Sequence, residues 1–581
     1  MFKKTDPQQS LFGVQSQLTA SLEARLKDSW AQLFRSEVLP ILFKSEEHFS
    51  VLYGQTGRPN FSVARMLGLC LLQELNTMSD QQALDAFGFD IRWRHALDVS
   101  APDAYLSRRS LVEFRRRLAS HDPDMRIIRT IFDSISKIAI KKLGLSTGEQ
   151  RVDSTHIVSN ICTRGRLDLF KKTIGHFIKS LDKKQYSQIP RRIRKWLQRE
   201  PEGWFGMGNA GNKQNLEQLA RYLHKLIVIF ENDSKVTGSE PYQLMVRLFK
   251  EQCKVVEKHG PDKDRRGGKQ IKVKKKTQGE TLQSPFDPDA SYGHKGQGYS
   301  VHITETCNNG KKPEIITDYE VHGAARSDIG KATDVVDRLE STGLKPSTLF
   351  ADGGYPSVPS TAKMIERDIE FMTPVNRSRL PDDMIGRDQF AFDNNGLVLK
   401  CPEQHPPVDH RMRSANNKKG SSLHAIFNGD ICRACKRLDH CPVRAPNNRK
   451  CGSNPRDTTG DFRLEITPAL RLRDQMYTEQ HTEHWKKRYK IRSGIEATMS
   501  ELKRSHGLGK LRVRRAAKVC FAVACKVMAC NIKRWAQASE GSDSLLYRFI
   551  CRLMGPLRAT QAAMRQISPY STIGQNICWE N

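Results

Sequence analysis

The stretch Tyr489-Lys-Ile-Arg-Ser-Gly-Ile-Glu-Ala-Thr-Met-Ser-Glu-Leu-Lys503 is the part of the chain on which the interpretation of the fold depends. Read as one helix at about 100° per residue, it places Tyr489, Arg492 and Lys503 within about 40° of the azimuth of Glu496. A carboxylate suited to a metal ion would then be flanked by groups suited to phosphate. An i, i+4 pair such as Arg492 with Glu496 is common on surface helices, whereas the full spacing is much rarer.

Two aspartates further upstream complement this carboxylate. Asp153 lies in the β-prone run Glu149–Val158, and Asp352 ends the short apolar run 347–351, just before two glycines. Taken singly, they have simpler explanations, a strand-edge aspartate and an Asp-Gly turn. Taken with Glu496, they predict a site for two Mg²⁺ ions. Hard Mg²⁺ prefers carboxylate oxygens, and two such ions suit phosphodiester cleavage.

The spacing Y-x2-R-x3-E-x6-K, carried by Tyr489, Arg492, Glu496 and Lys503, resembles the signature of bacterial insertion-sequence transposases with an Asp, Asp, Glu triad. The resemblance covers most of the chain, from about residue 61 to residue 535. It implies that Arg492 and Lys503 clamp DNA phosphates near the cut and that Tyr489 positions the same DNA backbone.

The resemblance also implies the chemistry of the three acids. Asp153 would bridge two Mg²⁺ ions, for which Mn²⁺ can substitute, and Asp352 and Glu496 would each hold one. The protein would bind the terminal inverted repeats of its element, hydrolyse the strand ends and join the freed 3′-OH to target DNA. Two alternatives stay open: a related nuclease without strand transfer, and a catalytically inert DNA-binding or regulatory derivative.

Composition points to the same partner. The chain has 95 Lys and Arg against 64 Asp and Glu, a formal net charge of +31. This is the electrostatic footprint of a protein that binds double-stranded DNA, and such binding should weaken steeply with salt. The positive excess gathers in Lys183–Arg199, Lys263–Lys276, Lys486–Lys490 and Lys503–Arg515. Any one of these runs is also explained as a solvated face.

The N-terminal region is expected to be helical. Helices are predicted at Phe61–Leu75, Ser79–Phe87 and Ser107–Leu118, the last strongly basic. Three short helices in this order suggest a helix-turn-helix, and Arg115 and Arg116 are candidate DNA contacts. The alternative is a helical dimerisation bundle whose arginines are merely exposed. The resemblance favours a DNA-end-binding role.

The rest of the core has an alternating pattern. Strands are predicted at Tyr299–Thr306, Pro313–Val321 and Phe371–Val375, and a helix at Asp328–Leu339. With the strands of the two aspartates, the order is strand, two strands, helix, strand, helix, strand. Together with the resemblance, this order predicts an α/β fold with an RNase-H-like core.

Five parts are predicted along the chain. They are a helical N-terminal DNA-binding domain (1–145), an RNase-H-like catalytic core (146–178, 284–378 and 478–540), a helical insertion with a basic linker (179–283), a Cys-rich insertion (379–477) and a C-terminal tail (541–581). Helical patterning is expected through Glu257, and a polar linker from Gly260 to about Gln283.

The Cys-rich insertion holds a candidate zinc site. The C-x2-C-x5-C run with one distant cysteine can supply four thiolates to a tetrahedral Zn²⁺. The preferred ligands are Cys401, Cys432, Cys435 and Cys441, with His405, His440 or Cys451 as possible substitutes. The alternative is a set of reduced, unliganded cysteines on a loop. Any zinc here would be structural.

The setting follows from what the sequence lacks. The first residues have no apolar segment typical of a secretory signal, and no apolar run reaches membrane-spanning length. Val519–Ile532 is interrupted by Lys526 and is expected to be a buried helix. The 14 cysteines are expected to be reduced, in a bacterial cytoplasm, with the protein on the nucleoid when it binds DNA. A homo-oligomer assembled on DNA is the expected form.

Overall fold

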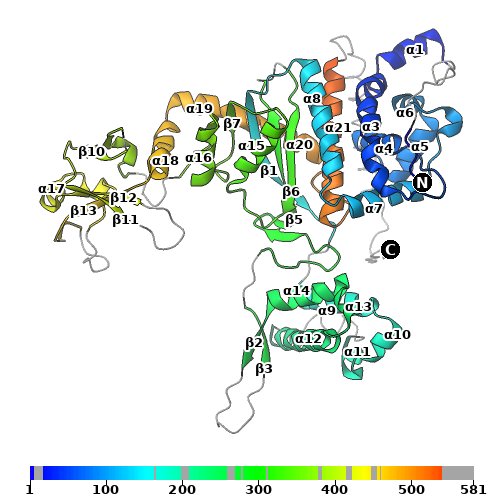
Figure 1. The fold of residues 1–581 in the computed structure, drawn as a ribbon, viewed down its shortest axis with the longest axis horizontal. Coiled ribbons are helices and arrows are strands. Elements are labelled where there is room, and N and C mark those ends of the chain that lie inside the picture. Colours follow the sequence, from blue (N-terminus) through cyan, green and yellow to red (C-terminus); the bar gives the residue numbers. More distant parts are fainter. Residues whose placement is uncertain are drawn as a thin grey trace, which may run out of the picture.

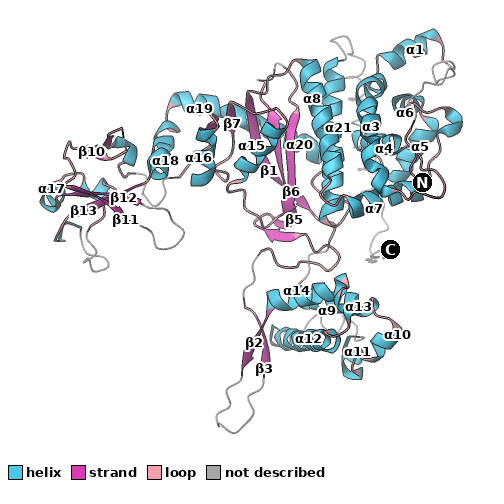
Figure 2. Cartoon of the chain, viewed as in Figure 1, coloured by secondary structure: helices cyan, strands magenta, loops and turns pink. Residues whose placement is uncertain are grey.

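The computed structural model describes residues 1–5, 18–161, 165–197, 209–257, 269–275, 279–308, 310, 312–376, 383–394, 396–413, 422–445, 455–457 and 459–539. A mixed sheet stands at the centre, with the N-terminal helices on one flank and the Cys-rich segment on the other (Figure 1). Helices dominate everywhere except this sheet and the small sheets of the outlying parts (Figure 2).

The central sheet has six strands. They are β1 (Glu149–Val158), β4 (Ser291–Gly293), β5 (Gly296–Thr306), β6 (Ile316–Gly323), β7 (Thr348–Phe350) and β8 (Glu370–Met372). β5 pairs antiparallel with β1, β4 and β6, whereas β7 pairs parallel with β1 and β8. Helices α15 (Lys331–Ser341) and α16 (Val358–Glu366) connect β6 to β7 and β7 to β8. This is the order of elements expected from the sequence.

β1 spans the residues predicted for it, Glu149–Val158. β-Branched residues favour an extended chain, and Val152 and Ile157 are fully buried in the core. Asp153 lies opposite Ile303 of β5, near the middle of this pairing. The central strand β1 therefore carries the Asp153 carboxylate near the middle of the sheet.

The N-terminal helices share one hydrophobic core with the sheet. They are α1 (Ala20–Lys27), α2 (Trp30–Leu33), α3 (Leu39–Ser45), α4 (Val63–Leu75), α5 (Asp80–Phe89), α6 (Ile91–Leu97), α7 (Arg108–His121) and α8 (Arg126–Leu143). The last described helix, α21 (Ala516–Ser539), packs against α4, α8 and β6. The buried helix predicted at Val519–Ile532 is thus confirmed, and it joins the two ends of the described chain.

The predicted helix-turn-helix needs one correction. Its three helices are present as α4, α5 and α7, and Ser79 caps α5 with a capping box. They are not consecutive, because α6 and a 3-10 turn (Ala101–Asp103) lie between α5 and α7. The extra helix forms because Trp93, Ala96 and Leu97 bury an apolar face that the sequence patterning had not singled out.

The segment between β1 and β5 has its own hydrophobic core. It contains α9 (Arg166–Lys179), α10 (Lys183–Ser187), α11 (Arg191–Leu197), α12 (Asn209–Phe230), α13 (Ser234–Thr237) and α14 (Glu240–Gln252). Two predictions for this segment are wrong. Residues Cys253–Glu257 form strand β2 where a helix was expected, and Lys269–Val273 form strand β3 where a linker was expected. The two strands form a hairpin because apolar residues face each other across it, Val255 opposite Ile271 and Cys253 opposite Val273.

The Cys-rich segment forms a third core around small sheets. Its elements are β9 (Ala391–Phe392), β10 (Val398–Lys400), β11 (Asp409–Arg413), β12 (Ser422–Phe427), α17 (Gly429–Ala434) and β13 (Phe462–Ile466). α18 (Pro468–Glu479) and α19 (Glu483–Tyr489) lead back to the central sheet. Over the described residues, none of the helices has the length and apolar character needed to cross a membrane.

Candidate active site

The three carboxylates singled out from the sequence converge on one guanidinium. Arg492 Nη2 lies 2.6 Å from Asp153 Oδ2 and 3.8 Å from Asp352 Oδ2. Arg492 Nη1 lies 3.6 Å from Glu496 Oε1. Acidic side chains from β1, from the loop after β7 and from the start of α20 (Ile495–Arg504) therefore face one point.

The cluster is closed on one side and open on the other. The exposed fraction of the side chain is 16% for Asp153, 49% for Asp352 and 69% for Glu496. Burial raises the pKa of Asp153, although the nearby Arg492 acts in the opposite direction. The open side leaves Asp352 and Glu496 accessible to a ligand from solvent.

The donor set fits a hard divalent cation. All three groups offer carboxylate oxygens, which Mg²⁺ prefers, and the cluster already draws one positive group, Arg492, into its centre. Three carboxylates that face one point repel each other unless a cation lies among them. These residues could hold metal ions if Arg492 moved aside.

The single helix expected from Tyr489 to Lys503 is wrong. α19 ends at Tyr489, Lys490–Gly494 form a 3-10 turn, and α20 begins at Ile495. Arg492 therefore lies in the turn and not on the helix that carries Glu496. The two side chains still meet, because they are four residues apart across the junction.

Arg151 of β1 contacts the backbone at this break. Its Nη1 donates a hydrogen bond of 2.8 Å to the Ile491 carbonyl, which an unbroken α-helix would pair with the N–H of Ile495. That N–H instead bonds to the Arg492 carbonyl, which is 3-10 geometry. A Cβ on Gly494 would lie 2.1 Å from Arg151 Nη1, so glycine is needed for this approach.

Tyr489 positions the protein's own backbone. Its hydroxyl donates to the Ala351 carbonyl at 2.9 Å, one residue before Asp352. Its ring stacks on Trp485 at a centroid distance of 4.5 Å, and both pack on a small apolar cluster that includes Phe350. Burial raises the pKa of Tyr489 to about 12, so its hydroxyl keeps its proton. Tyr489 thereby ties α19 to the strand that delivers Asp352.

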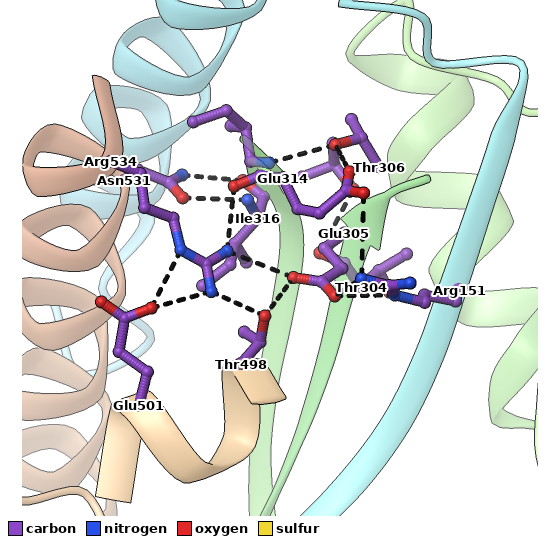
Figure 3. A network of polar contacts seen from close by, with 12 residues as sticks. Arg151, Thr304, Glu305, Thr306, Glu314, Ile316, Thr498, Glu501, Asn531 and Arg534 are labelled. Carbon is purple, nitrogen blue, oxygen red and sulfur yellow. Dashed lines mark hydrogen bonds and ion pairs between the residues drawn. The ribbon is translucent and has the colours of Figure 1, made fainter. Parts of the chain in front are cut away.

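A buried polar network fixes α20 on the sheet (Figure 3). Glu305 of β5 is fully buried and accepts from Arg151 Nε at 2.7 Å and from Thr498 Oγ1 at 2.5 Å. Arg534 of α21 lies 3.3 Å from Glu305 and donates to Glu501 of α20 at 3.0 Å. Strand, helix α20 and helix α21 are therefore locked together two residues from Glu496.

The sequence patterns did not single out Arg151, Glu305 or Thr498. One available signal was an ionisable residue inside a β-prone run: Glu305 follows Val301 and Ile303 in a strand that is buried on both faces. A buried charge needs a partner, so its presence predicts an arginine or lysine nearby.

The remaining candidate DNA contacts occupy different environments. Lys503 is exposed on α20. Arg116 is 61% exposed and pairs with Glu113 of its own helix. Arg115 points inward, where it bonds to Asp80 at 2.8 Å and to Gln73.

The four cysteines preferred as zinc ligands line one cavity of the third core: Cys401, Cys432, Cys435 and Cys441. Burial raises the pKa of Cys432 to about 12 and that of Cys441 to about 11. Of the substitutes, His405 lines the cavity, His440 pairs with Asp383, and Cys451 lies outside the described residues.

Two other groups of possible metal ligands come close together. Among the described residues, His302 with His322 and Asp328, and Glu501 with His506 and Cys530, have ligand atoms that all lie within 4.8 Å of one another.

Two segments match families of known proteins. Residues 25–117 match the family described as Transposase domain (DUF772), and residues 400–536 match the family described as Transposase DDE domain. The first match covers most of the N-terminal helices, and the second contains Glu496 and the four cysteines. Both family descriptions name transposases, so the matches support this class for the chain. More particularly, they support an insertion-sequence transposase of the DDE type. No curated protein and no solved structure matches the chain.

Proposed function

We propose that the protein is a DNA transposase that binds the terminal inverted repeats of its own element, cleaves the strand ends and joins them to target DNA. The observation that carries the proposal is the approach of Asp153, Asp352 and Glu496 to one guanidinium. The topology of the sheet supports an RNase-H-like core. β6, β5 and β1 pair antiparallel, and β7 and β8 then extend the sheet from β1 in parallel.

Asp153, Asp352 and Glu496 would hold the Mg²⁺ ions, for which Mn²⁺ can substitute. When bound, these ions supply an activated water and stabilise the leaving oxygen of a phosphodiester. Arg492 would leave the carboxylates and turn to a DNA phosphate, since a guanidinium binds either anion in the same forked geometry. Tyr489 would keep the Asp352 loop in place, and exposed Lys503 would contact the DNA backbone.

The parts of the chain would divide the work. Residues 1–145 would contact the element ends, with exposed Arg116 as a candidate contact. Residues 146–178, 284–378 and 478–540 would form the catalytic core, except for α9, which packs in the core of the inserted segment. The basic charge supports double-stranded DNA as partner. An oligomer assembled on the ends would allow both ends to be cut together. Residues 179–283 and 379–477 would be insertions, the second held by a structural zinc at its cysteines.

The decisive experiment compares Asp153→Asn with Asp124→Asn, which changes an exposed aspartate that pairs with exposed Arg126. Purified protein is mixed with DNA that carries the flanks of its own gene and with Mg²⁺. Asp153→Asn should lose cleavage and keep DNA binding, because it removes one metal-binding charge from an otherwise intact site. Asp124→Asn should cleave like the parent protein. Full cleavage by Asp153→Asn would remove that residue from the mechanism.

Precut ends distinguish the remaining functions. A transposase should join precut ends to a target plasmid, whereas a nuclease without strand transfer would cut uncut ends and leave precut ends unjoined. An inert derivative would bind the ends and do neither.

A further inference from the structure

A second cluster of ligating side chains lies near the segments that carry Asp153 and Asp352. His302 of β5 and His322 of β6 are buried, with exposed fractions of 0% and 5%. Their Nε2 atoms are 2.6 Å apart, and Asp328 Oδ1 lies 3.4 Å from His302 Nε2. None of these three residues takes part in the contacts among the three carboxylates of the active site.

The hydrogen bonds are consistent with two neutral rings. His322 Nδ1 lies 2.9 Å from the Gly323 carbonyl, which only accepts, so this nitrogen carries a proton and its Nε2 offers a lone pair. His302 Nε2 then donates to His322, and its Nδ1 accepts from the Tyr355 hydroxyl at 2.6 Å. Neutral imidazole is the form that binds a metal ion.

We propose that His302, His322 and Asp328 form a transition-metal site that takes Zn²⁺ and is separate from the Mg²⁺ site of the triad. Two imidazoles and one carboxylate are a common zinc donor set, whereas Mg²⁺ prefers oxygen ligands alone. Two nitrogens bound to one tetrahedral zinc at about 2.0–2.1 Å lie roughly 3.3 Å apart. The rings therefore need to separate by less than about 1 Å.

Outer partners for both imidazoles are already in place. The Gly323 carbonyl holds the distal nitrogen of His322, and the Tyr355 hydroxyl holds that of His302. On metal binding, the proton of His302 would move from Nε2 to Nδ1 and be donated to the Tyr355 oxygen. Such second-shell bonds orient the ligands of zinc sites and fix their tautomers.

The cations near the cluster already have carboxylate partners. Lys331 is paired with Glu320 at 2.7 Å and with Asp334 at 2.9 Å, and Arg338 is paired with Glu320 at 3.0 Å and with Asp318 at 2.9 Å. The rival group at Glu501 is less suitable, because Lys533 and Arg534 already neutralise that carboxylate.

The position of the cluster gives the ion a role. Asp328 Oδ2 accepts from Ser154 Oγ at 2.8 Å, and Ser154 adjoins Asp153. Tyr355 follows Asp352 by three residues, and its carbonyl accepts from the Gly330 N–H at 3.0 Å. A metal at His302, His322 and Asp328 would brace the two segments that present the catalytic aspartates.

The test measures zinc content without DNA, so its outcome does not depend on transposition. The parent is the full chain with Cys432→Ser and Cys435→Ser, which removes a zinc site made of thiolates. It is equilibrated with Zn²⁺ in excess Mg²⁺, desalted and analysed for metal. We expect about one zinc per chain in this parent and in a His294→Gln control, an exposed histidine. Addition of His322→Gln should reduce the content nearly to zero.

Two results would overturn the site: a parent without zinc, or equal zinc in the parent and in His322→Gln. If His322→Gln does not fold, X-ray absorption at the zinc edge of the parent decides the question. A first shell of nitrogen and oxygen with two imidazoles supports the site, and a shell without imidazole contradicts it.

Discussion

Among single residues, Arg492 offsets the repulsion among three carboxylates. Asp153, Asp352 and Glu496 would repel one another, and the guanidinium lies within 4 Å of an oxygen of each. The same side chain is proposed to bind a DNA phosphate next to the bond that the triad cuts. Its release from the carboxylates and the arrival of metal and DNA would therefore be linked events.

Two neighbouring arginines of α7 allow a matched prediction. Arg116→Gln should weaken DNA binding modestly and lower the salt dependence by about one unit of slope, because it removes one exposed charge. Arg115→Gln should instead destabilise the protein by about 2 kcal/mol, since it leaves Asp80 without its charged partner. Binding isotherms at several salt concentrations and urea unfolding measure the two effects.

The contrast between these variants is informative. Suppose that Arg115→Gln had the same free energy of unfolding as the parent protein but lost DNA binding. The Arg115 guanidinium of the parent protein would then have to leave Asp80 and reach the DNA. The inward position of Arg115 would then be only one of its states.

At the element scale, the junction of the 3-10 turn and α20 sets the position of Glu496. Gly494→Ala should reduce cleavage by about 100-fold, because the added Cβ would collide with Arg151 and shift Glu496 by about 1 Å. Gly175→Ala is the matched control: its Cβ meets nothing within 4 Å in α9, and the change should preserve activity. Cleavage assays on both proteins provide the measurement. Equal activities would show that the turn tolerates a side chain.

The network of Figure 3 makes a second prediction for the same helix. Glu305→Gln should destabilise the protein by about 3–5 kcal/mol, since Arg151 and Arg534 would lose a buried counter-charge. Thr498→Val should cost less, about 1–3 kcal/mol, because only a hydroxyl is lost. Urea denaturation tests the order, and a larger loss for Thr498→Val would contradict the assigned role of Glu305.

Elements defined by local pattern were predictable from the sequence. Glu149–Val158 is rich in β-branched residues, which favour a strand. Val519–Ile532 has apolar residues on nearly every side, which is typical of a buried helix. The break after Tyr489 was not predictable, because Arg151, which contacts the backbone there, lies more than 300 positions upstream. The β2–β3 hairpin was not predicted, because the lysines in this region obscured the pattern of apolar residues that pair across the two strands.

The candidate site was likewise predictable only in part. Acid residues at strand ends and at the start of a helix could be found from their spacing. Their support could not, because Glu305 and Asp328 acquire partners only when distant strands pair. The inward direction of the Arg115 side chain was also not predictable, since half-buried Arg115 adjoins exposed Arg116 in an arginine-rich run of α7.

At the scale of the whole molecule, one shared core predicts a response to acid. His95, fully buried among the N-terminal helices, has its pKa lowered from 6.5 to about 4, chiefly by burial and also by Arg35. Between these values the unfolded chain binds a proton that the folded chain does not. Stability is therefore complete above about pH 6.5 and falls as the pH drops toward 4, by at most about 3 kcal/mol from this residue.

His95→Gln should reduce that pH dependence while the Gln32 side chain still has a neighbour to bond. Urea midpoints at pH 7 and pH 5 provide the measurement. Some dependence should persist, because the pKa values of His302 and His506 are also lowered to about 4. An unchanged difference between the two midpoints would exclude His95 as a contributor.

The place of α21 between the N-terminal helices and β6 has a consequence for synthesis. The apolar faces of α4 and α8 are made hundreds of residues before the helix that covers them, so a nascent chain carries them uncovered until Ala516–Ser539 leaves the ribosome. Premature termination before Ala516 would yield a product with a permanently bare surface, a substrate for chaperones and proteases. Truncated copies of the chain would thus be degraded and would not accumulate.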